Sequence, residues 1–202
     1  MQNKKTKGTN SRTLFKMSGK VFVFTGPSGA GKTTLAQVIL KEMDSFQRII
    51  TYTTRGMREG EKDGIDSNFV SRKKFEQFIK DDKLLEHAIV YGNYYGSLRS
   101  DVEKIIASGK NVLFVVDVQG ALTIKKKFSS AITIFVKTPS LQELRERLEK
   151  RALDSKEIIE KRLTTAEQEL VLEGKFDFVV VNDVLLEAVA RVKEIISSSL
   201  KS

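Results

Sequence analysis

The sequence of 202 residues contains no cysteine and no tryptophan, two prolines and one histidine. Without cysteine, neither a disulfide framework nor a cysteine-ligated zinc site can form, and a reducing intracellular compartment fits this composition. His87 alone cannot build a multi-histidine metal site, and a Ser-His-Asp triad is not favoured. No apolar run reaches the roughly 18 residues of a membrane-spanning helix. The absences therefore leave a chain without disulfides or membrane spans, long enough for one globular domain and a small insert.

Acidic residues are also fewer than basic ones, 26 against 35, and the formal net charge is +9. This balance indicates an anionic partner, which can be nucleic acid, an anionic lipid or a phosphorylated small molecule. Much of the excess lies in the acid-free stretch MQNKKTKGTNSRTLFK at the start of the chain. We expect residues 1–18 to form a disordered basic tail; a short organelle presequence and an alternative start at Met17 are other interpretations.

From residue 20 onward, short apolar runs alternate with amphipathic segments. Four runs rich in Val, Ile and Phe predict strands buried on both faces of a parallel sheet, over Lys20–Thr25, Asn111–Asp117, Ala131–Lys137 and Phe176–Asn182. The helices expected between and after them cover Thr33–Met43, Asp101–Ser108, a segment from Ser140 with a capping box to Glu143, residues 154–173 ended by Gly174, and Val184–Leu200. The alternation predicts a doubly wound α/β fold with right-handed crossovers.

Residues 49–97 break this alternation. They combine the strand-like IITYTT, a charged loop with glycines, a short helix around Phe75–Ile79 and the segment LLEHAIVYGNYYGS. The pattern is typical of a small α+β insert rather than of another strand–helix–strand unit. Tyr91, Tyr94 and Tyr95 fall within five residues of this segment, where they can pack in a core or contact a ligand.

The most informative motif is GPSGAGKT at residues 26–33, which fits G-x-x-x-x-G-K-[ST] between an apolar strand and an amphipathic helix. Glycines let backbone N–H groups curl around phosphate, and the following helix directs its positive end at the anion. Lys32 can reach the β- and γ-phosphates, and the Thr33 hydroxyl can ligate Mg²⁺. The sequence therefore predicts nucleoside triphosphate binding in a three-layer fold of the P-loop NTPase type. The ATP-binding candidates are Gly26, Pro27, Ser28, Gly29, Ala30, Gly31, Lys32, Thr33 and Thr34.

A P-loop alone does not separate kinases from ATPases or GTPases, but further motifs follow in order. These are TTRxxRxGE from Thr53, EHAxVxGNYYGS from Glu86, DVQGA from Asp117 and VND from Val181. Together with the P-loop they resemble the guanylate kinase family over residues 20–200. The resemblance implies transfer of the γ-phosphoryl group of MgATP to GMP, and to dGMP, in purine nucleotide metabolism. It also implies a core at residues 19–48, 98–138 and 165–202, a GMP-binding insert at 49–97 and a helical lid at 139–164.

The resemblance assigns roles to individual residues. Arg55 and Arg58 match the pair that holds the GMP phosphate, and Tyr95 matches a tyrosine that hydrogen-bonds it. A carboxylate suits guanine because it accepts from the adjacent N1–H and N2–H₂ groups, whereas adenine has no donor at N1. The implied GMP-binding residues are Thr51, Arg55, Arg58, Glu86, Tyr95, Ser97 and Asp117. The implied catalytic residues are Lys32, Arg147, Arg151 and Arg162, with Mg²⁺ as cofactor and Thr33 as its ligand.

Three positions depart from the family pattern. Ser67 stands where the family has a phosphate-binding tyrosine, and its hydroxyl is too short for the same direct contact. Val115 replaces the first acid of an L-D-x-D strand end, which leaves Asp117 as the acid of that pair. The third departure is in the lid, where Lys150-Arg151-Ala152 stands in place of a G-R-G sequence and removes hinge freedom.

Other interpretations remain open at this stage. Arg147 is four residues from Arg151 among several acids, so this helix can also be a salt-bridged exposed surface. The other function classes are a guanylate-kinase-like binding module, a P-loop kinase of another small phosphorylated substrate, and a nucleic-acid binder based on the tail. We expect ATP and GMP as the partners, no nucleic acid, no membrane, a cytoplasmic location, and a monomer or homodimer.

Overall fold

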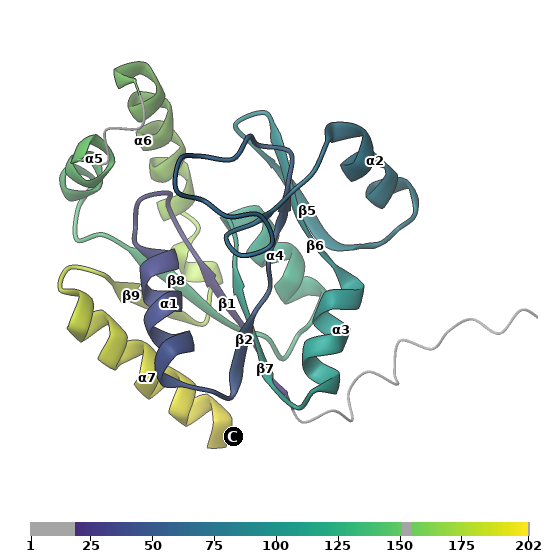
Figure 1. Ribbon diagram of the computed structural model, residues 1–202. Helices are drawn as coiled ribbons and strands as arrows, with labels where there is room; N and C mark the ends of the chain where they lie inside the picture. The colour runs from purple at the N-terminus through teal and green to yellow at the C-terminus, as the bar shows by residue number, and fades with distance from the viewer. Residues whose placement is uncertain (1–18, 151–154, 202) are drawn as a thin grey trace, which may run out of the picture.

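The computed structural model describes residues 19–150 and 155–201 (Figure 1). The expected basic tail, Arg151 and Ala152 lie outside the described residues. The elements follow in the order β1 (Val21–Thr25), α1 (Lys32–Glu42), β2 (Phe46–Arg48), β3 (Tyr52–Thr53), β4 (Asn68–Phe69), α2 (Arg72–Lys80), β5 (Leu84–Val90), β6 (Asn93–Leu98), α3 (Arg99–Ala107), β7 (Asn111–Val115), α4 (Val118–Lys127), β8 (Ile132–Lys137), α5 (Leu141–Lys150), α6 (Lys156–Leu170), the 3-10 helix η2 (Glu173–Lys175), β9 (Phe178–Val181) and α7 (Leu185–Lys201).

A parallel sheet with the strand order β2-β7-β1-β8-β9 forms the centre of the molecule. The four expected strands are all present, and β2 is an additional edge strand that the sequence did not indicate. Its sequence, Phe-Gln-Arg, buries only Phe46, so it lacks the apolar run by which a strand is recognised. The predicted α/β fold with a central parallel sheet flanked by helices is confirmed.

Alternate side chains of β1 supply the cores on the two faces of this sheet. Phe22 and Phe24 pack with side chains of α1 and α7 on one face, and Val21 and Val23 pack with α3 and α4 on the other. Figure 1 shows these two helix pairs on opposite sides of the strands. Strands β1, β7 and β8 are buried on both faces, which is why their sequences are continuous apolar runs without alternation.

A second sheet of four strands, ordered β4-β3-β6-β5, lies beside the carboxyl ends of the central strands (Figure 1). It has its own small core with α2, in which Phe75 and Phe78 pack against Leu84 and the ring of Phe75 stacks on Tyr94. Tyr91, between β5 and β6, has φ of 48° and the following Gly92 has φ of 79°. Positive φ at both positions is typical of the tight turn that matches the twist of a β-hairpin.

Helices α5 and α6 form a further pair with a separate core of Leu144, Leu148, Ile159 and Leu163. The guanidinium of Arg145 forms an ion pair with Glu160 across the two helices. The expectation that one helix continues to Glu173 and ends at Gly174 is wrong. Helix α6 ends at Leu170 with Val171 as its C-cap, and Gly174 lies inside η2. Leu170 and Leu172 still pack against the central core on either side of the exposed Val171.

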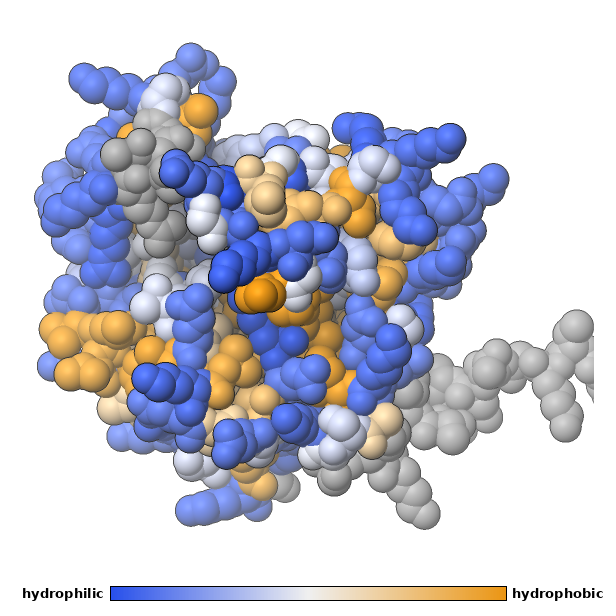
Figure 2. All heavy atoms as spheres, in the orientation of Figure 1, coloured by the Kyte–Doolittle hydropathy of each residue, from blue (hydrophilic) through white to orange (hydrophobic). Residues whose placement is uncertain are grey.

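The surface is largely hydrophilic in the view of Figure 2, with an apolar area over the end of β9 and the start of α7. Exposed apolar side chains in that region are Val181, Val184 and Leu186. In residues 19–150 and 155–201, no helix has the length and apolar character needed to cross a membrane. The expectation of a monomer or homodimer stays a prediction.

Candidate active site

The carboxyl ends of β1 and β7 are neighbours, and the loops that follow them lead to helices on opposite faces of the sheet. Such a point in an open α/β sheet is where a crevice forms and ligands bind. A cavity of about 240 Å³ lies there. It is lined by Gly26, Ser28, Lys32, Thr33, Arg48, Thr51, Ser67, Glu86, Ala88, Val90, Tyr91, Tyr95, Val115, Val116, Asp117, Thr165 and Glu169. The cavity thus joins the P-loop to one face of the second sheet.

The P-loop follows β1 and passes close to the ends of neighbouring strands. Gly26 has φ of 121°, and a Cβ there would lie 2.1 Å from the carbonyl oxygen of Val136. Gly31 has φ of 89°, and it begins α1 without a side-chain cap. The Lys32 ammonium donates to the carbonyl oxygens of Gly26 at 2.6 Å and of Pro27 at 2.8 Å. The lysine is therefore folded over the loop at the positive end of α1, where an anion binds.

Asn182, at the end of β9, fixes the outer side of the P-loop. Its Nδ2 donates to the buried carbonyl oxygen of Ala30 at 2.9 Å. Arg147 of α5 donates to the carbonyl oxygens of Asn182 at 2.8 Å and Asp183 at 3.3 Å. Arg147 also forms an ion pair with the carboxylate of Glu143. The backbone N–H of Glu143 donates to the Ser140 hydroxyl, which is one of the two hydrogen bonds of the expected capping box. Sequence reasoning gave Asn182 no role beyond membership of the VND motif, although a polar residue directly after an apolar run was a usable signal.

Glu86 and Asp117 enter the cavity from different elements and converge on α4. Glu86 is 3% exposed, and its Oε1 accepts a hydrogen bond of 2.8 Å from the hydroxyl of Ser97, its cross-strand partner. Asp117 caps α4 by accepting from the Gly120 N–H at 2.7 Å. A Cβ on Gly120 would lie 3.0 Å from both the Asp117 Oδ1 and the Glu86 Oε2. Ser97 is fully buried behind Glu86 and does not line the cavity.

Burial raises the pKa of Glu86 to about 7; the nearby Asp117 acts in the same direction, and the Ser97 hydrogen bond acts against it. Burial also raises the pKa of Asp117, against the effects of the Gly120 hydrogen bond and of Lys32. Glu169 of α6 lines the same cavity, and burial raises its pKa to about 7 while Lys32 opposes the shift. Perturbed carboxylates gathered in one crevice are typical of a functional site. Sequence reasoning missed Glu169, which resembles any acid of an amphipathic helix.

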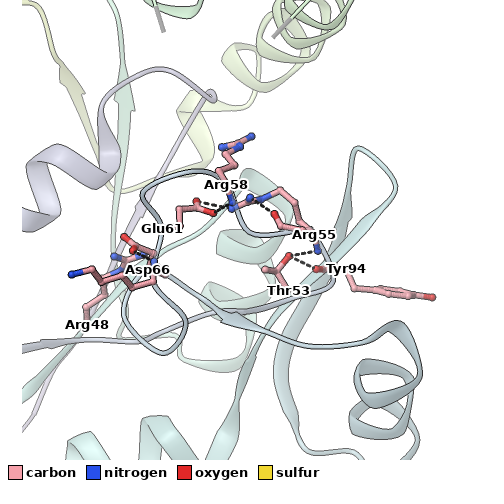
Figure 3. Close-up of polar contacts among 9 residues, drawn as sticks. Arg48, Thr53, Arg55, Arg58, Glu61, Asp66 and Tyr94 are labelled. Atoms are coloured by element: carbon pink, nitrogen blue, oxygen red, sulfur yellow. Dashed lines mark hydrogen bonds and ion pairs between the residues drawn. The ribbon is translucent and has the colours of Figure 1, made fainter. Parts of the chain in front are cut away.

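The loop after β3 carries the expected arginine pair (Figure 3). Arg55 donates from Nη2 to Glu61 at 2.8 Å, and the backbone N–H of Arg58 donates to the other oxygen of Glu61 at 2.8 Å. Burial acts to lower the pKa of Arg55, but Glu61 and Tyr95 together raise it. Tyr95 lines the cavity, whereas neither Arg55 nor Arg58 does, and Figure 3 shows the Arg58 side chain extending away from the loop.

The candidate lid arginines have different surroundings. Arg147 lies beside a smaller cavity that Gly29, Gly31 and Thr34 also line. Arg162 is 9% exposed, and its guanidinium lies 5.8 Å from the ring centroid of Tyr91. Arg147 lies on α5 and Arg162 on α6, and Arg151 lies outside the described residues. Tyr91 lines the main cavity but was not singled out within the tyrosine cluster.

Comparison with known proteins agrees with these motifs. The guanylate kinase family model matches residues 18–199. The chain belongs to the guanylate kinase family. It is 41% identical over 178 residues to guanylate kinase from Clostridium perfringens strain 13, covering 88% of this chain and 82% of that protein. It is 44% identical over 166 residues to guanylate kinase from Chlorobaculum tepidum, covering 82% and 85%. The family reaction is the phosphorylation of GMP by ATP.

A solved structure is also similar. The crystal structure of guanylate kinase from Anaplasma phagocytophilum superposes with a TM-score of 0.77 at 29% sequence identity, covering 94% of this chain and 90% of that one. The resemblance predicted from the motifs is thus confirmed, as is the expected class of nucleoside monophosphate kinase.

Asn182→Ala should loosen the P-loop because it leaves the buried carbonyl of Ala30 without its donor. We expect the free energy of unfolding to fall by about 1–3 kcal/mol and the KM for ATP to rise. Urea denaturation and steady-state kinetics measure both quantities. Gln77→Ala on the exposed surface of α2 is the matched amide control, and an equal loss in that variant would contradict a specific role of Asn182.

Glu86→Gln should stabilise the protein without ligand at high pH. The folded state binds this proton more tightly than the unfolded chain, because the pKa of about 7 exceeds the ordinary value of 4.5. The contribution of Glu86 to stability is therefore fully present below pH 4.5 and is lost as the pH rises through about 7. We expect the variant to be more stable than the native protein at pH 8, by up to roughly 3 kcal/mol, and equal to it near pH 4.5.

Chemical denaturation at the two pH values checks this result. Glu103→Gln on the exposed side of α3 serves as control. A stability difference between native and variant proteins that does not depend on pH would contradict the raised pKa of Glu86.

Proposed function

We propose that this chain catalyses the reaction of its family, transfer of the γ-phosphoryl group of ATP to GMP with release of ADP and GDP. The observation that carries the proposal is that one cavity is lined both by the P-loop and by the buried carboxylate of Glu86. The first holds the phosphates of a donor nucleotide, and the second selects the base of an acceptor. The same arrangement accepts dGMP, since none of these contacts requires a ribose hydroxyl.

Glu86 is the residue that selects guanine. Its carboxylate accepts from N1–H and N2–H₂, and the Ser97 hydroxyl holds it in place from behind. Adenine offers no donor at N1 and would leave a desolvated carboxylate unpaired, which is costly. Thr51 lines the cavity with a hydroxyl that suits guanine O6, and Asp117 provides a second acceptor near the base.

Arg55, Arg58 and Tyr95 bind the GMP phosphate. The Arg55 guanidinium is already oriented by Glu61 and lies next to Tyr95. Tyr95 lines the cavity, so its hydroxyl is available there as a hydrogen-bond donor. Arginine matches phosphate oxygens with two parallel N–H groups, so the contact gives orientation as well as affinity. Without ligand the Arg58 side chain extends away from the loop, and it contacts the phosphate when GMP is bound.

The donor ATP binds along the P-loop from Gly26 to Thr34, with Lys32 on the β- and γ-phosphates. The cavity wall is suited to Mg²⁺, because the Thr33 hydroxyl is a hard oxygen ligand beside the P-loop and Glu169 lines the same cavity. Within the described ranges no three carboxylate or histidine residues form a metal cluster by themselves, in keeping with an ion held largely by ATP and water. When bound, Mg²⁺ neutralises charge on the phosphates.

Catalysis then consists of positioning and charge stabilisation, without a covalent intermediate. Lys32 holds the transferred group, and Arg147, Arg151 and Arg162 supply positive charge around it. The helix pair α5–α6 and the second sheet each have a separate core, which supports motion of a lid at 139–164 and an insert at 49–97 against the core at 19–48, 98–138 and 165–202. A cytoplasmic location is supported by the lack of cysteine.

A coupled assay with ATP and each of GMP, AMP, CMP and UMP tests the proposal directly. We expect kcat/KM for GMP to exceed that for AMP by at least about 100-fold, because Glu86 loses its partners with adenine. Equal turnover of AMP would contradict guanine selection. No turnover of any nucleotide would contradict phosphoryl transfer and favour a binding module.

Lys32→Met should lower kcat by about 100- to 1,000-fold, since one charged donor to the transferred group is lost. GMP affinity measured by calorimetry should change little, because Lys32 acts on the donor. Lys41→Met, an exposed lysine in the last turn of the same helix, is the control. An unchanged kcat in the Lys32 variant would place the catalytic phosphates elsewhere.

A further inference from the structure

Arg48 enters the main cavity from a position to which neither the motifs nor the family resemblance assigns a role. It is the last residue of β2, the edge strand that the sequence did not indicate. The backbone of β2 pairs with β7 up to the register Arg48–Leu113, so this residue lies level with the middle of β7, where the chain leaves the central sheet. It lines the cavity together with Thr51, Ser67 and Tyr95.

The guanidinium of Arg48 is incompletely paired. Its Nη2 donates to the carbonyl oxygen of Asp66 at 3.2 Å, and Figure 3 shows the two residues side by side. Its Nε is buried and has no hydrogen-bond partner in the part of the chain that the structure describes. The ion pairs found among residues 19–150 and 155–201 do not include Arg48. Burial lowers the pKa of Arg48 more than the attraction of Asp66 raises it.

A desolvated cation with an unused donor is expensive unless an anion completes its contacts. The carboxylate of Asp66 does not do so, since its Oδ2 accepts from the backbone N–H of Lys62 and its carbonyl holds the guanidinium. Arg48 lines two cavities, a second one of about 340 Å³ that Asp101 also lines, and the main cavity, which Lys32 of the P-loop also lines. An anionic group that enters the main cavity can therefore complete the contacts of the arginine.

Ser67 directly follows Asp66 and lines the same cavity. The family has a tyrosine at this position that donates to the acceptor phosphate, and serine is too short to reach it. Resting on the proposed function, we propose that Arg48 binds the phosphate of GMP in place of that missing tyrosine hydroxyl. Arg48 is then a substrate-binding residue of this chain, and the substitution at residue 67 is compensated from β2.

A purely structural role is the competing explanation, because the bond from Arg48 to the Asp66 carbonyl tethers the loop before β4. The two roles differ in how they respond to residue 67. A tyrosine at position 67 can supply a phosphate donor, but it cannot replace the tether. Rescue of an Arg48 variant by Ser67→Tyr therefore separates substrate binding from support of the loop.

The experiment compares the native chain, Arg48→Leu, Ser67→Tyr and the double variant, with Arg191→Leu on the exposed surface of α7 as control. Calorimetry measures the affinity for GMP and for guanosine without ATP, and kinetics measures kcat and both KM values. We expect Arg48→Leu to weaken GMP binding by about 10- to 100-fold, with guanosine affinity and the KM for ATP unchanged. Ser67→Tyr should restore much of the GMP affinity in the double variant.

Four results would overturn the proposal: unchanged GMP affinity in Arg48→Leu, an equal loss for guanosine, a parallel loss for ATP, or no rescue by Ser67→Tyr. Thermal unfolding of each variant shows whether a loss comes from the fold. Because GMP binding is measured without turnover, failure of this inference is distinct from failure of the proposed function. A native chain that binds GMP through Arg48 but transfers no phosphoryl group would contradict only the latter.

Discussion

Burial of the Glu86 carboxylate is the constraint on which the proposed acceptor side of the site depends. A carboxylate selects guanine strongly only where water cannot replace the base as donor, and the same dehydration disfavours its charge. The neighbouring residues reflect both requirements. Ser97 supplies one hydrogen bond from a fully buried position, and Gly120 leaves room for two carboxylates at the start of α4. Under the proposed role of Glu86, the buried carboxylate therefore lowers the stability of the protein without ligand and provides selectivity for guanine.

The two halves of the cavity meet because of how the strands end. Strands β1 and β7 are neighbours whose following helices cover opposite faces, so their loops diverge and open a crevice at the carboxyl edge. The P-loop leaves β1 against the backbone of β8 at Gly26 and against the Asn182 side chain at Gly31, approaches that a Cβ atom at either glycine would block. The second sheet then places Glu86 and Tyr95 over the same opening. Neither half of the site is complete without the other.

Much of this arrangement could be predicted from local patterns, and the failures have physical causes. The buried parallel strands and the P-loop are contiguous in sequence, so their apolar runs and glycine spacing indicated both. Strand β2 was missed because it buries a single side chain, and the end of α6 was misplaced because Gly174, taken as the stop, lies beyond the helix inside η2. Arg48 and Glu169 reach the cavity through tertiary packing alone, so no local sequence signal distinguished them from surface charges.

The cations of the site differ in what they contact before substrate arrives, and this difference bears on affinity. Lys32 donates to two P-loop carbonyls and Arg55 to Glu61, so phosphate binding at either residue exchanges one set of acceptors for another. The net binding free energy from such an exchange is modest, although the existing hydrogen bonds already hold the two side chains in position. Arg48 has a buried Nε that gives up no acceptor when an anion arrives. Arg48 is already partly desolvated in the folded chain, so a phosphate contact there loses less hydration than a contact at an exposed arginine would.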